Sequence, residues 1–232
     1  MMQDERDFID DLMEAVDPQR IVDTAKHLLE EEALARKAFR EWVKPDVKAE
    51  FINGRVIVHS PAKRRHNQAT GFVSHLLMSF VLSRDLGEVA VEKALVGLKR
   101  NDVEPDVCYW PKEISDLFTD DMNVYPPPSL VVEVLSKSTQ LRDRGVKKDA
   151  YESDGVTEYW VVDPVAETLH QYVLEKSVAG ELVYSLRKHY VENDDVESIV
   201  LEGFSVPLRA LFDGRQCNRE AVRLSATEGP EV

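Results

Sequence analysis

Two carboxylates in short apolar segments are the residues best placed in this sequence to do chemistry. The first, Glu133, interrupts a run of otherwise apolar residues at 130–135. A run that is apolar on both faces is typical of a central, buried strand. A lone carboxylate in such a strand costs several kcal/mol. Glu133 is therefore expected to be protonated, paired with a lysine or arginine, or bound to a metal.

The second carboxylate, Asp106, follows Pro105 at the start of another apolar segment, 107–110. Taken alone, an aspartate after a proline is typical of a turn or a cap. Two carboxylates on neighbouring strands repel each other unless a cation lies between them. Hard oxygen ligands suit Mg²⁺ or Mn²⁺. The pair Asp106 and Glu133 therefore predicts a divalent metal site.

Two cationic side chains could complete such a site. Helical spacing turns Lys147, and not Lys148, toward the sheet, although pairing with Asp143 four residues earlier is the alternative. His66 lies in the first turn of a predicted helix, near the edge of its buried stripe. A core-edge histidine without a ligand role is the alternative there.

Alternating strand and helix patterns place these residues in an α/β domain. Asn53-Gly54 predicts a hairpin turn within 49–59, and apolar residues at i, i+4 and i+8 predict a helix over 66–83. Further strands are predicted at 88–98, 105–110, 130–136 and 159–163, an outer hairpin at 168–174 and 182–190, a helix ending near 153, and a closing element at 204–212. A helical extension over 1–37, with Asp17-Pro18 as a helix start, precedes a domain over 38–215 and a partly disordered tail over 216–232.

Composition narrows the class of protein. The chain has 232 residues, 43% hydrophobic and 31% charged, with no apolar run long enough for a bilayer and no signal-peptide pattern, which predicts a cytoplasmic globular protein. The net charge of −14 argues against non-specific duplex binding. Basic clusters at 63–66 and 137–148 still leave room for a small basic cleft. GxSxG, HExxH and P-loop motifs are missing.

The ordered motifs of the sequence resemble the Uma-type family of putative restriction endonucleases, a bacterial branch of the PD-(D/E)xK nuclease superfamily. The resemblance covers residues 38–212 and rests on the order and spacing of several motifs. These are Glu50-x-Ile52-Asn53-Gly54, Ser60-Pro61, His66, Pro105-Asp106-Val107, Val132-Glu133-Val134-Leu135-Ser136, Asp143-x-x-x-Lys147-x-x-x-Tyr151 and Tyr159-Trp160-Val161-Val162-Asp163-Pro164.

This resemblance implies a restriction-endonuclease-like fold, a mixed central β-sheet flanked by helices. It also implies that Asp106, Glu133 and the backbone carbonyl of Val134 bind Mg²⁺ or Mn²⁺, which activates a water against a DNA phosphodiester bond. Leu135 stands where the superfamily has its lysine, and Lys147 is expected to act from the helix instead. The remaining supporting residues are His66 as an extra ligand, Tyr151 as a site-shaping residue, and Glu50 and Ser136.

Three functions follow as hypotheses. The first is an Mg²⁺-dependent DNA endonuclease, expected as a homodimer because two sites cut two strands. The second is a non-catalytic or regulatory binding module on a nuclease fold. The third is a metal hydrolase of small phosphate esters or nucleotides, which the acidic charge favours.

Overall fold

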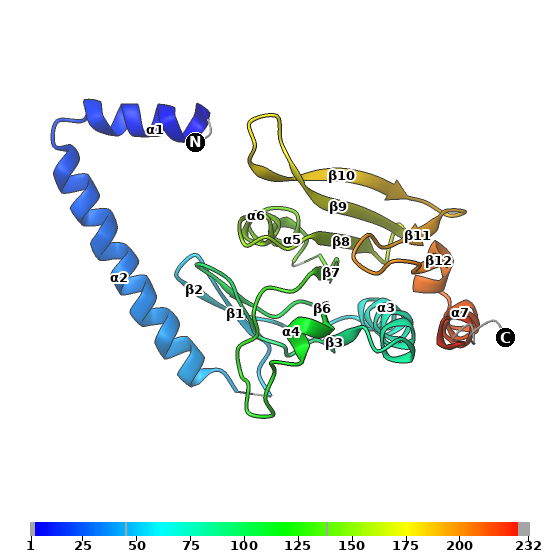
Figure 1. The fold of residues 1–232 in the computed structure, drawn as a ribbon. Coiled ribbons are helices and arrows are strands. Elements are labelled where there is room, and N and C mark those ends of the chain that lie inside the picture. Colours follow the sequence, from blue (N-terminus) through cyan, green and yellow to red (C-terminus); the bar gives the residue numbers. More distant parts are fainter. Residues whose placement is uncertain (1–2, 45, 138, 227–232) are drawn as a thin grey trace.

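The computed structural model describes residues 3–44, 46–137 and 139–226, and its centre is a mixed six-stranded sheet (Figure 1). Its strand order is β10-β9-β8-β7-β6-β3. Strands β7 and β8 are parallel, and the other neighbours are antiparallel. The expected mixed central sheet flanked by helices is confirmed. The strands are β3 (Gly87–Val91), β6 (Val107–Pro111), β7 (Leu130–Val134), β8 (Glu158–Asp163), β9 (Thr168–Lys176) and β10 (Leu182–Tyr190).

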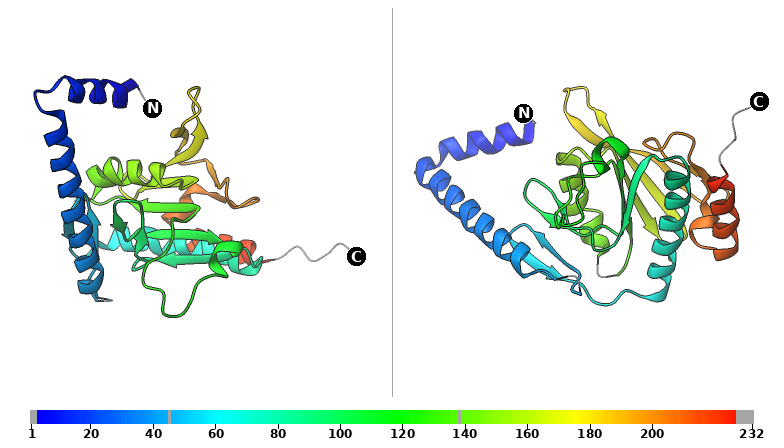
Figure 2. Two further views of the ribbon diagram at one scale, coloured as in Figure 1. Left: turned by 60° about the vertical axis from the view of Figure 1, so that its left-hand side comes forward. Right: turned by 60° about the horizontal axis from the view of Figure 1, so that its bottom comes forward.

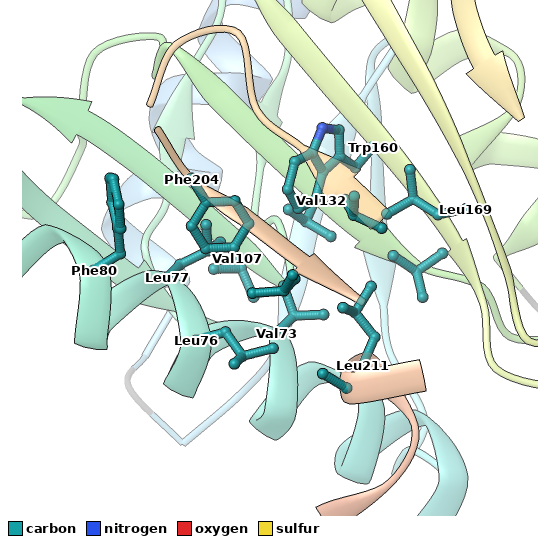
Figure 3. Close-up of a cluster of buried hydrophobic side chains, with 14 of the residues drawn as sticks. Val73, Leu76, Leu77, Phe80, Val107, Val132, Trp160, Leu169, Phe204 and Leu211 are labelled. Carbon is teal, nitrogen blue, oxygen red and sulfur yellow. The ribbon is translucent and has the colours of Figure 1, made fainter. Parts of the chain in front are cut away.

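One face of the sheet packs on α3 (Arg64–Ser83). Leu76, Leu77 and Phe80 of this helix meet Val132 and Trp160 of the sheet (Figure 3). This buried stripe is the one that the spacing of apolar residues predicts. The same core is closed by β11 (Asp195–Glu197), β12 (Ser205–Pro207), η1 (Leu208–Leu211) and α7 (Gly214–Ser225).

The other face of the sheet carries the side chains of Asp106 and Glu133. A second core there joins Val131 and Tyr159 of the large sheet to Tyr151 of a short helix and to Val96 and Val103 of a smaller sheet. The smaller sheet has the order β2-β1-β5-β4. These elements are α5 (Gln140–Asp143), α6 (Val146–Ser153), β1 (Ala49–Ile52), β2 (Arg55–Val58), β4 (Val96–Gly97) and β5 (Asp102–Val103), while α4 (Lys112–Ser115) follows β6.

The turn between β1 and β2 and the backbone break after β3 show where local sequence predicts this architecture and where it does not. Asn53 and Gly54 both have positive φ, 48° and 77°, and join β1 to β2 as the predicted hairpin. The single strand expected over 88–98 was wrong. It breaks after β3, where Glu92 and Lys93 have φ of 47° and 50°, a backbone region that non-glycine residues rarely occupy.

The N-terminal extension consists of α1 (Gln3–Glu14) and α2 (Pro18–Trp42), and Asp17 caps α2 as predicted. The views agree that α1 and the start of α2 extend away from the sheets (Figures 1 and 2). The end of α2 docks on the smaller sheet, where Phe39 is buried with Phe51.

The C-terminal segment forms more regular structure than expected. Residues 216–225, assigned to the tail by sequence, belong to α7, whose Cys217, Ala221 and Leu224 are buried. These three residues recur at helical spacing among polar neighbours, which explains the amphipathic helix. The rest of the expected tail, 227–232, lies outside the described residues. Among the described residues, no helix is both long and apolar enough to cross a bilayer.

Candidate active site

The two carboxylates singled out from sequence lie at adjoining strand ends, on the face that carries α5 and α6. Strands β6 and β7 pair with Val107 opposite Val132. One more step in this antiparallel register sets Asp106 opposite Glu133. Both side chains are buried. Two anions this close in a low-dielectric environment need compensating positive charge, which the neighbouring elements supply.

Asp106 accepts contacts on both of its oxygens. Lys48 Nζ lies 2.9 Å from Oδ1, and His66 Nε2 lies 3.5 Å from the same oxygen. The backbone N–H of Val134 donates to Oδ2 over 2.9 Å. Burial favours the neutral acid, but His66 and Lys48 outweigh it and hold the pKa of Asp106 well below its usual range. Asp106 is therefore an ionised carboxylate, oriented by the end of β7.

A third candidate ligand, Glu92, joins Asp106 and His66 from the break after β3. One ligand atom each of His66, Glu92 and Asp106 lies within 4.8 Å of the others. An imidazole nitrogen with two carboxylate oxygens is a donor set suited to a divalent cation. One ring nitrogen of His66, Nδ1, is buried and has no hydrogen-bond partner within the described part of the chain. The residues present therefore fit a divalent metal.

Glu133 is surrounded by a second, inner group of side chains. Lys147 Nζ lies 2.5 Å from its Oε1, and the Tyr151 hydroxyl donates to the same oxygen over 2.7 Å. Burial raises the pKa of Glu133 to about 8, and the nearby carboxylates of Asp143, Asp106 and Glu50 add to this while Lys147 opposes it. Glu133 is therefore harder to ionise than an ordinary glutamate, and added positive charge nearby would favour its carboxylate form.

Lys147 connects three carboxylates. Besides Glu133, its Nζ lies 2.8 Å from Glu50 Oε1 and 3.8 Å from Asp143 Oδ1. Burial disfavours the ammonium, yet these acids raise the pKa of Lys147 well above its ordinary value. The alternative of a solvent lysine paired only with Asp143 is therefore excluded by its buried position.

Glu50 belongs to this inner group and is more than a strand-end charge. Its Oε1 also accepts the backbone N–H of Glu104, and His59 Nε2 lies 2.9 Å from its Oε2. Burial opposes ionisation, but Lys147 and His59 overcome it and lower the pKa of Glu50 to about 2. Glu50 is therefore an ionised partner of the Lys147 ammonium.

Ser136 and Val134 have positions of a different kind. The Ser136 hydroxyl lies 3.0 Å from Thr139 Oγ1 and shapes the turn between β7 and α5. Val134 contributes its N–H to Asp106, as described above. The structure thus gathers Asp106 with His66, and Glu133 with Glu50, Lys147 and Tyr151.

Sequence reasoning missed two members of the site, Glu92 and Lys48. Nothing in the sequence announces the backbone break that directs Glu92 toward Asp106, because neither Glu92 nor Lys93 is a usual left-handed residue. Lys48 could have been found. It stands two residues before Glu50, and strand alternation places such residues on one side of the chain.

Exposed basic residues flank the site on two segments. Lys63, Arg64 and Arg65 directly precede His66 at the start of α3, and Lys137 and Arg144 lie on either side of α5. These are parts of the basic clusters identified from sequence. They give an acidic protein local positive charge next to its buried carboxylates.

Comparisons with known proteins place this geometry in context. A family model described as "Putative restriction endonuclease" (Uma2) matches residues 36–209. A solved structure of a putative nuclease belonging to DUF820 from Anabaena variabilis superposes with a TM-score of 0.61 at 14% identity, covering 75% of this chain and 94% of that chain. No curated protein matches the chain. At that identity the solved structure supports the fold, while the family model covers most of the chain.

Proposed function

Because the chain belongs to the Uma2 family of putative restriction endonucleases, we propose that it is a metal-dependent endonuclease that hydrolyses DNA phosphodiester bonds. The observation that carries this proposal is the group of His66, Glu92 and Asp106, with ligand atoms within 4.8 Å of one another. It lies on a nuclease-like fold, beside a second buried carboxylate.

In this proposal the residues divide into two tasks. Asp106, His66 and Glu92 hold Mg²⁺ or Mn²⁺, and Glu133 becomes a further ligand when it loses its proton. The backbone carbonyl of Val134 remains a predicted ligand. A divalent ion at this place supplies an activated water and offsets the charge on the phosphate.

The remaining side chains fix the carboxylates. Lys147 holds Glu50 and Glu133 in place from α6, and the Tyr151 hydroxyl orients Glu133. Outside the buried group, the exposed residues Lys63 to Arg65 and Arg144 are suited to contact the phosphate backbone. This local charge makes a nucleic-acid substrate compatible with the acidic chain as a whole.

A plasmid-nicking assay tests the proposal. We expect the wild-type chain to nick plasmid DNA in Mg²⁺ or Mn²⁺ and to stop in EDTA. Asp106→Ala should reduce the nicking activity more than about 100-fold. Changes to residues that only support a metal ligand cost up to roughly 100-fold, and Asp106 is proposed as a ligand itself. Asp121→Ala, which changes an exposed acid in a loop, is the matched control and should cleave as wild type does. Equal nicking by wild type and Asp106→Ala would identify a contaminant and contradict the proposal.

The net charge of −14 favours a second candidate, hydrolysis of small phosphate esters or nucleotides at the same metal site. Turnover of nucleotides without turnover of plasmid or single-stranded DNA would select it. Tight DNA binding without any cleavage would select a regulatory binding module instead.

The homodimer predicted from two-strand cleavage stays a prediction, and sedimentation measures the oligomeric state directly.

A further inference from the structure

Two lysines flank the buried carboxylates, and their surroundings differ. The Lys147 side chain is 3% exposed, and its ammonium faces Glu133, Glu50 and Asp143. The Lys48 side chain is 23% exposed, and its ammonium contacts Asp106. A group that contacts a polymer substrate must be reachable from solvent. The two lysines are therefore suited to different tasks.

Lys147 is suited to holding the site together. Its Nζ lies 2.5 and 2.8 Å from two carboxylates, and Glu133 Oε1 also accepts the Tyr151 hydroxyl. Moving this ammonium toward a phosphate would leave Glu50, which is held ionised, as a buried anion without its cation, and that costs several kcal/mol. Lys147 is therefore poorly suited to contact a substrate.

Lys48 occupies a position beside Asp106 where a bound metal ion would repel its ammonium. Its ammonium lies 2.9 Å from Asp106 Oδ1, the same oxygen that His66 approaches to 3.5 Å. His66, Glu92 and Asp106 form the candidate metal site. A divalent cation there would stand within a few ångströms of a like charge, and such repulsion is strong in a partly buried place.

The Lys48 side chain has somewhere to go. It reaches Asp106 from the segment just before β1, on a flexible four-carbon stem, and is partly open to solvent. The ammonium can therefore move away from Asp106 while the backbone of Lys48 stays in place. An anionic group brought beside Asp106 would meet it there.

We propose that Lys48 is the substrate-facing lysine of this site: its ammonium neutralises Asp106 in the metal-free protein and moves to the scissile phosphate when a metal binds. The assignment rests on the proposed endonuclease function. It predicts two opposite effects of one substitution. Without Lys48 the metal loses a competitor and binds more tightly, while the phosphate loses a positive partner and is cleaved more slowly.

Lys48→Met tests both effects because it keeps the length of the side chain and removes its charge. We expect Mn²⁺ affinity, measured by calorimetry on the full chain, to rise about 2- to 5-fold, the scale of one weak ion pair. Plasmid cleavage at saturating Mn²⁺ should fall about 100-fold, the scale of losing one donor to the charge that develops in the transition state. Lys44→Met, an exposed lysine on the same segment, should change neither quantity.

Each outcome bears on the assignment. Unchanged Mn²⁺ affinity in Lys48→Met, or cleavage at the wild-type rate, overturns it. Partial recovery of cleavage by Lys48→Arg supports it and also serves if Lys48→Met fails to fold, since the arginine keeps the charge. Should the wild-type chain bind Mn²⁺ but cleave no nucleic acid, the proposed function fails, and the affinity comparison alone still decides whether Lys48 competes with the metal.

Discussion

At the scale of single residues, the inner part of the site is a charge balance around one ammonium. Lys147 faces three carboxylates, of which Glu50 is held ionised and Glu133 is pushed toward its neutral form. Such an arrangement is stable only while its cation is present. Glu133 is thereby available to balance an additional positive charge near Asp106. In return, the buried charges around Lys147 tolerate little change in sequence.

Lys147→Met should show this dependence. Removing the cation leaves Glu50, Glu133 and Asp143 buried without their shared partner, and breaking a buried ion pair in this way costs about 3–5 kcal/mol. Urea unfolding at pH 7 in EDTA measures the loss. Lys148→Met is the matched control, because Lys148 is the next residue and lies half-buried over the rings of Tyr172 and Tyr184. That cation–π contact is worth about 1 kcal/mol. Equal losses in the two variants would mean that Lys147 is no more than a packed side chain.

The helix phase explains why this part of the site could be read from sequence. Lys147 is buried and Lys148 is only half-buried, as a rotation of about 100° per residue dictates. Glu133 stood out because its neighbours on β7 are apolar. By contrast, the partners of each carboxylate could not be read. Lys48 and Asp106 are 58 residues apart, and the pairing of β1 with β5, which lies just before Asp106 in the chain, brings them together.

At the scale of elements, irregular backbone does the positioning that regular strands cannot. The break after β3 turns Glu92 to Asp106, and the backbone N–H of Glu92 donates to the Asp106 carbonyl over 3.0 Å. The expected helix ending near 153 is also two pieces, α5 and α6, separated around Gly145. Periodicity predicts the extent of such elements, but it carries no information on where they break.

The docking of α2 is a second element-level feature that sequence did not reveal. Arg36 and Arg40 each donate through two nitrogens to Asp102 of β5, over 2.6–3.0 Å. The side chain of Asp102 is fully buried. Burial would raise the pKa of Asp102, but Arg40 and Arg36 outweigh it and lower the pKa below its ordinary value of 3.8. The extension is thus held by two ion pairs that share Asp102 and depend on pH.

Asp102→Asn should weaken this attachment in a pH-dependent way. At pH 7 we expect a loss of about 2 kcal/mol in unfolding free energy, the scale of hydrogen bonds to a charged group. A carboxyl whose pKa is lowered by folding stabilises the fold at pH values above its pKa in the unfolded chain. It loses that contribution as the pH falls through its pKa in the folded protein. The gap between wild type and Asp102→Asn should therefore shrink as the pH drops below 3.8. Urea midpoints at pH 7 and pH 3 check this, and a gap that stays constant would contradict it.

At the scale of the whole molecule, the negative charge is unevenly distributed. Residues 1–35 contain eleven acidic and three basic residues, a net charge of −8 out of −14 for the chain. Several apolar side chains of the same part, including Phe8, Met13 and Leu28, are exposed. The acidic excess therefore belongs largely to the helices that extend away from the sheets, and the basic residues beside the site belong to the domain.

Under the proposed function, this separation predicts that the extension weakens the binding of DNA by long-range repulsion. Replacing Asp10, Asp11 and Glu14 by their amides removes three exposed charges from α1 without shortening the chain. We expect duplex affinity, measured by fluorescence anisotropy in Ca²⁺ to prevent cleavage, to rise several-fold at 50 mM salt. The gain should vanish near 0.5 M salt, because the screening length falls to about 4 Å.

The matched control is an equal change of charge at Glu175, Glu181 and Glu192, which lie on or beside the hairpin of β9 and β10. If both triple variants gain affinity equally, the repulsion reflects total charge alone. If only the α1 variant gains, the extension lies near the path of the duplex, and the acidic helices restrict which nucleic acids reach the carboxylates. An unchanged affinity at low salt in the α1 variant would show that the extension has no electrostatic influence on the site.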